Sequence, residues 1–296
     1  YFGGHVDVRR TTVDRVPHLP TPVRTSVPAR RDQMTTILQI TDTHIVRDGA
    51  LVSDRLDTAA ALARLIDRIQ SARNQIGTID VVLISGDLSD DGSAQSYERF
   101  KTLLAPLDLP LLVILGNHDV RAPMRAAFAG QFKQDGPLDW VTQVGDLRII
   151  GLDTLVEKSG KGTLCAQSLV FLKTALAEGN DTPTLLSLHH PPFRSVINFM
   201  DNIGLTIRAA FSDVVSDHTG PLRIVCGHIH SMIVTDVEGH IAISAPSPWS
   251  TFAYNRRIDA TVGFMALEDG CLLHTWDGAF QTIRFGPDAG PGPFPF

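Results

Sequence analysis

Short apolar runs alternate with amphipathic segments along most of this chain, and this alternation is the strongest constraint on its fold. Six runs have the length and apolar content of buried strands: 37–40, 79–84, 111–115, 147–152, 185–188 and 222–226. Helix-like spacing of apolar residues marks three other segments: 54–73, 93–105 and 166–178. A strand–helix–strand order needs crossover connections, so the pattern predicts largely parallel sheets with helices on their outer faces.

The pattern changes toward the two ends of the chain. Later apolar runs have no helical segment between them, which predicts an antiparallel continuation: 232–237, 241–244, 261–267 and 272–276. Residues 1–33 carry six arginines against three aspartates, together with four prolines, and are expected to form an extended arm. Met34 opens a segment that looks like a natural start, which favours an upstream or added origin for this arm. We expect the globular domain over 34–284 and a Pro/Gly-rich tail over 285–296.

The composition excludes several classes of protein. A 43% hydrophobic fraction with 20% charged residues is typical of a globular chain and argues against wholesale disorder. The net charge of −6 argues against a chain that coats nucleic acid or an anionic membrane. No apolar run approaches the roughly 20 residues that span a bilayer. The three cysteines have no CxxC spacing, so we expect no disulfide framework and a cytoplasmic location.

Polar motifs follow five of the predicted strands, where α/β folds place their sites. They are DTH at 42–44, GD at 86–87, GNHD at 116–119, HHPP at 189–192 and GHIH at 227–230. Each motif alone is weak, because Asp and Gly are common in turns and a single His is often a satisfied core residue. Five of them together indicate a metal site, because buried, unpaired imidazoles and carboxylates are costly without a cation. These ligand types suit Zn, Mn or Fe.

The ordered series DTH, GDLSDDG, GNHD, HHPP and GHIH resembles the calcineurin-like metallophosphoesterase superfamily, over roughly residues 34–276. Within it, the chain is similar to the bacterial branch of class III cyclic-nucleotide phosphodiesterases and glycerophosphodiesterases. The resemblance implies an α/β fold, a four-layer αββα sandwich of two mixed β-sheets flanked by helices. It implies that 34–284 is the catalytic domain, with 191–217 as a cap-like segment.

The resemblance also implies ligands for two divalent metal ions. It assigns four residues to one ion: Asp42, His44, Asp87 and His230. It assigns four to the other, with Asp87 bridging: Asp87, Asn117, His189 and His228. Such mixed ligands accept Mn, Fe, Zn or Co and leave the metal identity open. Two ions about 3.5–4 Å apart can neutralise a phosphodiester and lower the pKa of a bridging water, so that a hydroxide attacks.

In the same resemblance, His118 contacts the phosphate and protonates the leaving group. Asp119 is placed to orient His118, the alternative being a plain salt link in the loop. His190 either supports the metal ligands or simply packs. The expected substrate-binding residues are Asn117, His118, Phe193 and Arg194.

Two segments are expected beside the metals. The cap over 191–217 would bring four residues near the substrate: Phe193, Arg194, Met200 and Asp201. Its alternative is an ordinary surface helix with apolar residues packed inward. In segment 244–255, Trp249 and Tyr254 would stack on a base or an aromatic ester, unless they only pack.

Departures from related families narrow the expected substrate. Asp90 stands where purple acid phosphatases have a tyrosine, and Asp91 stands where protein Ser/Thr phosphatases have a phosphate-gripping arginine. We therefore expect hydrolysis of small phosphodiesters, either cyclic nucleotides or glycerophosphodiesters. The alternatives are a phosphomonoesterase or phosphonate-ester hydrolase on the same site, and a non-catalytic scaffold protein. No membrane and no stable nucleic-acid partner is expected, and a homo-oligomer is left open.

Overall fold

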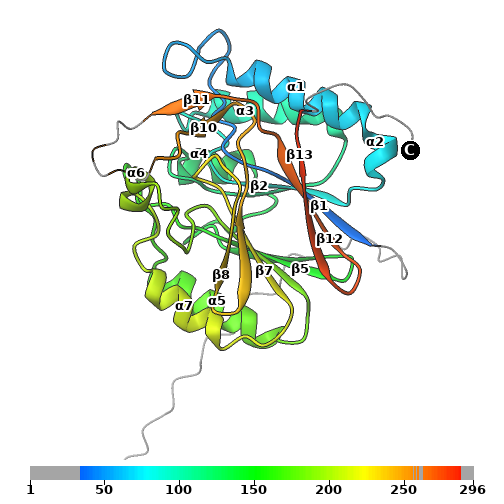
Figure 1. Ribbon diagram of the computed structural model, residues 1–296, viewed down its shortest axis with the longest axis vertical. Helices are drawn as coiled ribbons and strands as arrows, with labels where there is room; N and C mark the ends of the chain where they lie inside the picture. The colour runs from blue at the N-terminus through cyan, green and yellow to red at the C-terminus, as the bar shows by residue number, and fades with distance from the viewer. Residues whose placement is uncertain (1–33, 256, 258, 260–262, 288–296) are drawn as a thin grey trace, which may run out of the picture.

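Two large β-sheets pack face to face in the computed structural model (Figure 1). It describes residues 34–255, 257, 259 and 263–287, so the expectations for 1–33 and 288–296 lie outside the described residues. Within that range, the first sheet has the order β13-β12-β1-β2-β3: β1 (Thr35–Ile40), β2 (Val81–Ser85), β3 (Leu111–Ile114), β12 (Cys271–Trp276) and β13 (Phe280–Phe285). The second has the order β4-β5-β6-β7-β9-β8: β4 (Trp140–Val144), β5 (Leu147–Leu152), β6 (Thr184–Leu188), β7 (Leu222–Cys226), β8 (Ile233–Val237) and β9 (His240–Ser244).

Helices cover the outer faces of the two sheets. Those associated with the first sheet are α1 (Thr58–Ser71), α2 (Arg73–Ile76), α3 (Ala94–Leu104), the 3-10 turn η1 (Ala105–Leu107) and α4 (Arg121–Ala127). Those after β5 are α5 (Ala166–Glu178), α6 (Asn198–Asn202) and α7 (Arg208–Ser216). Strands β10 (Ser250–Phe252) and β11 (Phe264–Ala266) form a separate small hairpin.

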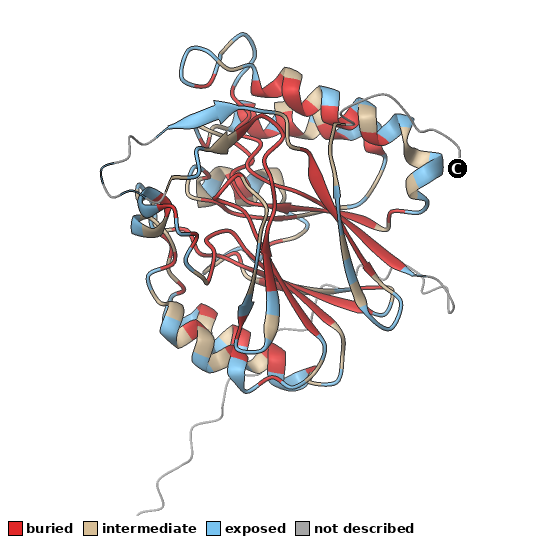
Figure 2. Cartoon of the chain, in the orientation of Figure 1, coloured by how far each residue is buried: buried red, intermediate tan, exposed pale blue. Residues whose placement is uncertain are grey.

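The core explains the four layers. One apolar cluster joins α1 and α3 to β1, β2 and β3 and continues to inward-facing residues of β5, β6 and β7. A second cluster joins the opposite face of β5, β6 and β7 to α5 and α7. Figure 2 shows the strands of both sheets as buried and the outer sides of the helices as exposed. The predicted αββα sandwich of mixed sheets is therefore confirmed.

The strand and helix predictions hold in the middle of the chain and fail in particular places. All six predicted strands form, and β1-β2-β3 and β5-β6-β7-β9 pair in parallel. The helix predicted from residue 54 begins at Thr58, because the side chain of Asp57 caps it by accepting from the Ala60 N–H. The antiparallel continuation is correct for β8 with β9, and the runs predicted at 261–267 and 272–276 form β11 and β12, which pair antiparallel with β10 and β1. Phe285, expected in the tail, is instead the last residue of β13.

The structure also bears on the membrane and disulfide expectations. No helix in the described part of the chain has the length and apolar character needed to cross a membrane. All three cysteines are free, with Cys165 exposed and Cys226 and Cys271 buried.

A polar chain runs between the two sheets. Gln39 Nε2 donates to Ser85 Oγ at 2.7 Å and to the Cys226 carbonyl at 3.1 Å, and its Oε1 lies 2.8 Å from His274 Nε2. His274 Nδ1 lies 3.0 Å from Thr282 Oγ1. His274 is fully buried, and burial, followed by the charge of Arg223, lowers its pKa to about 3.

This buried histidine should make the fold sensitive to acid. Between its ordinary pKa of about 6.5 and pH 3, the unfolded chain binds a proton here that the folded chain does not, so stability falls as the pH drops through this window. Between pH 7 and pH 5, His274→Gln should lose about 2 kcal/mol less free energy of unfolding than the wild type. Urea unfolding of both proteins at the two pH values measures this. Parallel losses would contradict a neutral, buried His274.

Candidate metal centre

Five loops carry the candidate ligands, and each follows the carboxyl end of a strand: β1, β2, β3, β6 or β7. Parallel pairing within each sheet brings these ends to one edge. Backbone hydrogen bonds join the loops: the Asp42 N–H donates to the Gly86 carbonyl at 3.0 Å, and the Gly227 N–H donates to the His189 carbonyl at 3.1 Å. The His228 N–H, after β7, donates to Asp42 Oδ2, after β1, at 3.0 Å, so the two sheets deliver their loops to a single place.

The backbone at this place is strained. Five candidate ligands have a positive φ: Asp42 (52°), His44 (45°), Asp87 (50°), His228 (70°) and His230 (55°). Non-glycine residues rarely adopt this conformation, which costs on the order of 1–3 kcal/mol each. Such outliers persist only where the surrounding structure holds them, and they cluster at functional sites.

Two motif glycines allow the backbone to approach the carboxylates. A Cβ atom on Gly116 would overlap Oδ1 of Asp87, and one on Gly227 would overlap Oγ1 of Thr41 and crowd Asp42. The glycines of the GNHD and GHIH motifs are therefore required by space at the centre rather than by turn geometry alone.

The first group of ligand atoms comes from Asp42, His44 and His230, which are all buried. His230 Nε2 lies 3.3 Å from Asp42 Oδ1. The carboxylate of Asp42 is held in place because it accepts from the His228 N–H at 3.0 Å and from Thr41 Oγ1 at 2.8 Å.

The second group comes from Asp87, His189 and His228, also buried. His189 Nε2 lies 3.3 Å from both Asp87 Oδ2 and Asn117 Oδ1. The same Asp87 oxygen lies 3.5 Å from His44 Nε2, in the first group. Asp87 thus reaches both groups, and Asn117 adds an oxygen to the second.

The hydrogen bonding of the histidine rings shows that these residues suit divalent cations. Nε2 of His44 and Nε2 of His228 are buried and have no hydrogen-bond partner among the described residues. The opposite ring nitrogens of three ligands are fixed from behind: His44 Nδ1 by Asp90 at 2.9 Å, His189 Nδ1 by the Ser85 carbonyl at 2.9 Å, and His230 Nδ1 by Ser250 Oγ at 2.7 Å. Unpaired buried nitrogens would be costly, whereas imidazoles oriented in this way are typical of metal ligands.

The charged groups perturb one another strongly. Burial alone would lower the pKa of His189, but the Asp87 and Asp42 carboxylates outweigh it and raise this pKa to about 9. Burial would raise the pKa of Asp87, yet the charges of His189 and His118 hold it well below its ordinary value. At His228, burial dominates and places the pKa well below its ordinary range. Ionised carboxylates beside the neutral imidazole of His228 form a donor set that binds divalent cations, and His189 would have to lose its proton to join them.

His118 lies beside the first group, and 41% of its side chain is exposed. Its backbone N–H donates to Asp87 Oδ1 at 2.8 Å. Its ring Nδ1 lies 3.3 Å from Asp90 Oδ1, the carboxylate that also fixes His44. Asp90 therefore connects a candidate ligand to the exposed imidazole, a role that was not predicted from the sequence.

The predicted role of Asp119 differs from its observed contacts. Its carboxylate is buried and accepts from the backbone N–H groups of Gly116 at 2.9 Å, Ser89 at 3.2 Å and Leu88 at 3.3 Å, and from Tyr97 Oη at 3.1 Å. Asp119 thus joins the GD loop to the GNHD loop, and Asp90 is the carboxylate that contacts His118. Because it accepts from four donors in these loops, the carboxylate of Asp119 points into the loops.

His190 packs behind the centre. Its ring lies 4.6 Å from that of His228 and 5.1 Å from that of His189, and its Nδ1 lies 2.8 Å from Thr154 Oγ1. Its Nε2 lies 3.2 Å from the Gly160 carbonyl. With both nitrogens engaged, His190 supports the ligand rings from behind, which combines the two alternatives.

The segment 191–217, predicted to be a cap, contains α6 and α7, and its residues differ in their exposure. Met200 is buried, and Asp201 accepts from the Ser195 N–H at 2.6 Å, so these two stabilise the segment itself. The Arg194 side chain is 78% exposed, and Phe193 is half-buried against two apolar clusters.

Trp249 is not free to stack on a substrate base. It is 8% exposed, and its indole N–H donates to the Asp42 carbonyl at 2.7 Å. Its ring lies 5.3 Å from His44 and 5.5 Å from His230. Trp249 therefore supports the ligands, whereas Tyr254 is 66% exposed.

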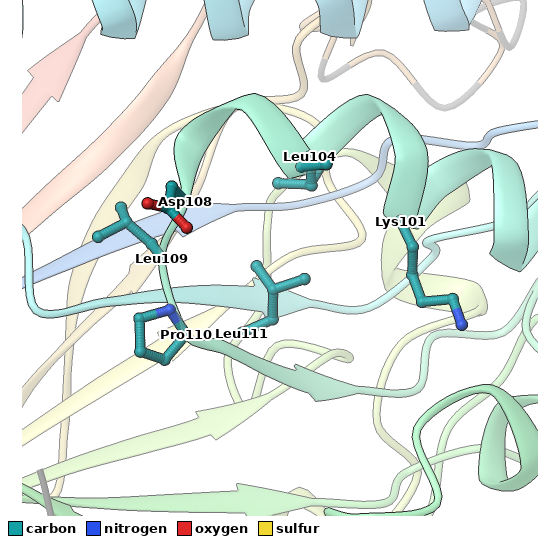
Figure 3. Close-up of a pocket in the computed structure, with 7 residues that line it drawn as sticks. Lys101, Leu104, Asp108, Leu109, Pro110 and Leu111 are labelled. Carbon is teal, nitrogen blue, oxygen red and sulfur yellow. The ribbon is translucent and has the colours of Figure 1, made fainter.

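Two pockets lie away from this centre. One of about 340 Å³ is formed where α3 ends and β3 begins, with Lys101, Asp108 and Leu111 in its lining (Figure 3). The other, of about 540 Å³, lies between the edge strands β3 and β4. Both include the first residue of β3, whereas Asn117 follows its last, and neither is lined by a candidate ligand.

Two packed sheets that gather His, Asp and Asn at their strand ends form the architecture of a metal-dependent hydrolase. The chain belongs to the calcineurin-like phosphoesterase family, whose model matches residues 35–232. The predicted family is thereby confirmed.

Relatives and solved structures agree. The chain is 31% identical over 265 residues to the probable glycerophosphodiester phosphodiesterase GpdQ of Arcobacter nitrofigilis, across 87% of this chain and 96% of that protein. It is 35% identical over 200 residues to the 3′,5′-cyclic adenosine monophosphate phosphodiesterase CpdA of Pseudomonas aeruginosa, across 67% and 71%. A dimetal phosphatase from Danio rerio shares the fold with a TM-score of 0.56 at 17% identity, across 84% of this chain and 98% of that one.

Proposed function

We propose that this chain is a dinuclear metal-dependent phosphodiesterase acting on small phosphodiesters. The observation that carries the proposal is the position of Asp87, whose Oδ2 lies 3.5 Å from His44 Nε2 and 3.3 Å from His189 Nε2. One carboxylate between two ligand groups is the arrangement that a pair of ions requires. The complete set of ligands argues against a non-catalytic scaffold.

The metal ligands proposed are those predicted from the sequence. One ion would be held by Asp42, His44, Asp87 and His230, and the other by Asp87, Asn117, His189 and His228. When bound, divalent Mn, Fe, Zn or Co would neutralise the phosphate and make water a better nucleophile.

The chain's own residues complete the chemistry. His118 is exposed beside the ligands and is held by Asp90, so its imidazole can give a proton to the departing ester oxygen. Asn117 carries its amide to the same place, which favours contact with a phosphate oxygen. Asp119 fixes the loop from which both residues project.

The acidic residues of the GD loop favour a monoanionic diester over a dianionic monoester. Asp90 lies at the centre, with 27% of its side chain exposed. Asp91 instead accepts from the Ser93 N–H at 3.0 Å, at the start of α3, and is not directed at the ligands. Only one of the two carboxylates therefore opposes a dianion, and we expect a moderate preference.

The substrate class is consistent with the relatives, one of which carries the name of a glycerophosphodiesterase and another that of a cyclic-nucleotide phosphodiesterase. A phosphomonoesterase or phosphonate-ester hydrolase on the same ligands is the second candidate. Free cysteines are consistent with the cytoplasmic location proposed from the sequence.

Comparison of two esters with the same leaving group tests this function. With saturating Mn²⁺ at neutral pH, kcat/KM should be roughly tenfold higher for bis(p-nitrophenyl) phosphate than for p-nitrophenyl phosphate, because one extra charge opposes Asp90. Release of p-nitrophenolate measures both reactions. A monoester preference would favour the phosphatase alternative.

A further inference from the structure

An aromatic wall adjoins the first ligand group. Phe252, the last residue of β10, has its ring centre 5.0 Å from that of His230. The ring centre of Phe199, on α6, lies 6.3 Å from that of Phe252. Figure 1 places α6 and the β10–β11 hairpin on the same side of the molecule, in agreement with these ring contacts.

The wall is held in position from behind. β10 also provides Ser250, whose Oγ lies 2.7 Å from Nδ1 of the candidate ligand His230. Phe252 therefore lies on the same strand, two residues after the side chain that fixes this ligand. Phe252 is half-buried and packs against the cluster of Ile197, Met200 and Ile229. A ring fixed by its neighbours loses little conformational freedom when a ligand binds it.

The outer part of the wall is accessible and apolar. Phe199 is 38% exposed, and Figure 2 shows exposed surface on α6 and on β11. Phe264 and Met265 of β11 are 43% and 60% exposed. Trp249 cannot take the same role, because it is buried and its indole N–H is already bonded.

We propose that Phe252, with Phe199 outside it, forms the subsite for a flat aromatic ester group of the diester, such as an aryl group or a nucleobase. The inference rests on the proposed function and selects among its substrates. A flat ring gains stacking contact on an aromatic face and is tolerant of its exact chemistry. A polyol such as glycerol would instead lose water from its hydroxyl groups without finding hydrogen-bond partners on phenyl rings.

Two synthetic diesters isolate this contact. Phenyl p-nitrophenyl phosphate and methyl p-nitrophenyl phosphate share a leaving group and differ only in the ester group that is retained. In the wild type the phenyl ester should have the higher kcat/KM. Phe252→Leu, which keeps apolar volume without the ring, should lower the phenyl-to-methyl ratio roughly tenfold, and Phe199→Ala by a few-fold.

A matched control and a natural-substrate comparison complete the experiment. Phe280→Ala removes a half-buried ring that packs on Trp276, outside the centre, and should leave the ratio unchanged. Metal content per chain is measured for every variant. With natural esters, 3′,5′-cyclic AMP should be hydrolysed with a higher kcat/KM than glycerophosphocholine, and Phe252→Leu should reduce that difference.

The outcomes distinguish a failure of the aromatic subsite from a failure of the proposed function. An unchanged phenyl-to-methyl ratio in both Phe252→Leu and Phe199→Ala, with metal retained, would overturn the aromatic subsite and leave the diesterase intact. A wild-type preference for glycerophosphocholine would overturn it as well. No hydrolysis of any diester by metal-loaded wild type would overturn the proposed function itself.

Discussion

Asp87→Ala is expected to lose both metals and to reduce diester hydrolysis by more than about 10³-fold. Loss of a supporting partner outside the coordination shell already costs about 10–100-fold, and Asp87 is the carboxylate that lies between both ligand groups. Its removal also leaves His189 without the neighbour that most raises its pKa. The protonated form of His189 then becomes less favoured, but Asp42 is left as the one carboxylate of the two ligand groups, too little negative charge to hold two divalent cations.

Elemental analysis and the rate of bis(p-nitrophenyl) phosphate hydrolysis measure this result together. Asp139→Ala is the matched control, because Asp139 is a half-buried carboxylate that accepts from the Asp153 N–H at 2.8 Å and lies outside the ligand groups. The control should keep its metal and its rate. Two metals per chain and near-normal turnover in Asp87→Ala would contradict the bridging assignment.

His118→Ala should keep both metals and lose roughly 10²–10⁴ in kcat, the usual contribution of a proton donor. The imidazole belongs to neither of the two ligand groups, although it lies within reach of His44 and Asp90, and it is 41% exposed. The loss should be smaller for p-nitrophenyl esters than for alkyl esters, because p-nitrophenolate departs with little need for protonation. A plain phosphate-binding role would reduce both kinds of ester equally.

The control for this variant is His240→Ala, since His240 lies at the start of β9 and its Nε2 contacts the His218 carbonyl, outside the centre. Its metal content and rates should match the wild type. Equal losses for aryl and alkyl esters in His118→Ala would remove the proton-donor role.

The sequence predicts the middle of the fold well because those strands are buried on both faces and therefore appear as continuous apolar runs. β1, β2, β5, β6 and β7 are of this kind, with every residue buried. β13 has a mixed pattern of half-buried and exposed residues at a sheet edge, and β4 is another edge strand with partly exposed residues. Edge strands carry a weak apolar signal, which is why both were missed.

The candidate ligands were visible because they stand in short motifs at strand ends, but their supports were not. Asp90 contacts His44 across the GD loop, and Ser250 contacts His230 from a strand twenty residues further along. Trp249 was noticed as an aromatic residue, yet its burial against Asp42 follows from the path of the chain after β9. Such contacts depend on the tertiary arrangement of loops, for which local sequence has no pattern.

The most direct test of a dinuclear diesterase is a titration of metal-free protein with Mn²⁺, followed by the hydrolysis rate of bis(p-nitrophenyl) phosphate. The position of Asp87 between two ligand groups predicts that the rate rises until two equivalents per chain are bound and then stays level. Full activity in metal-free protein, or a plateau at one equivalent, would contradict the account.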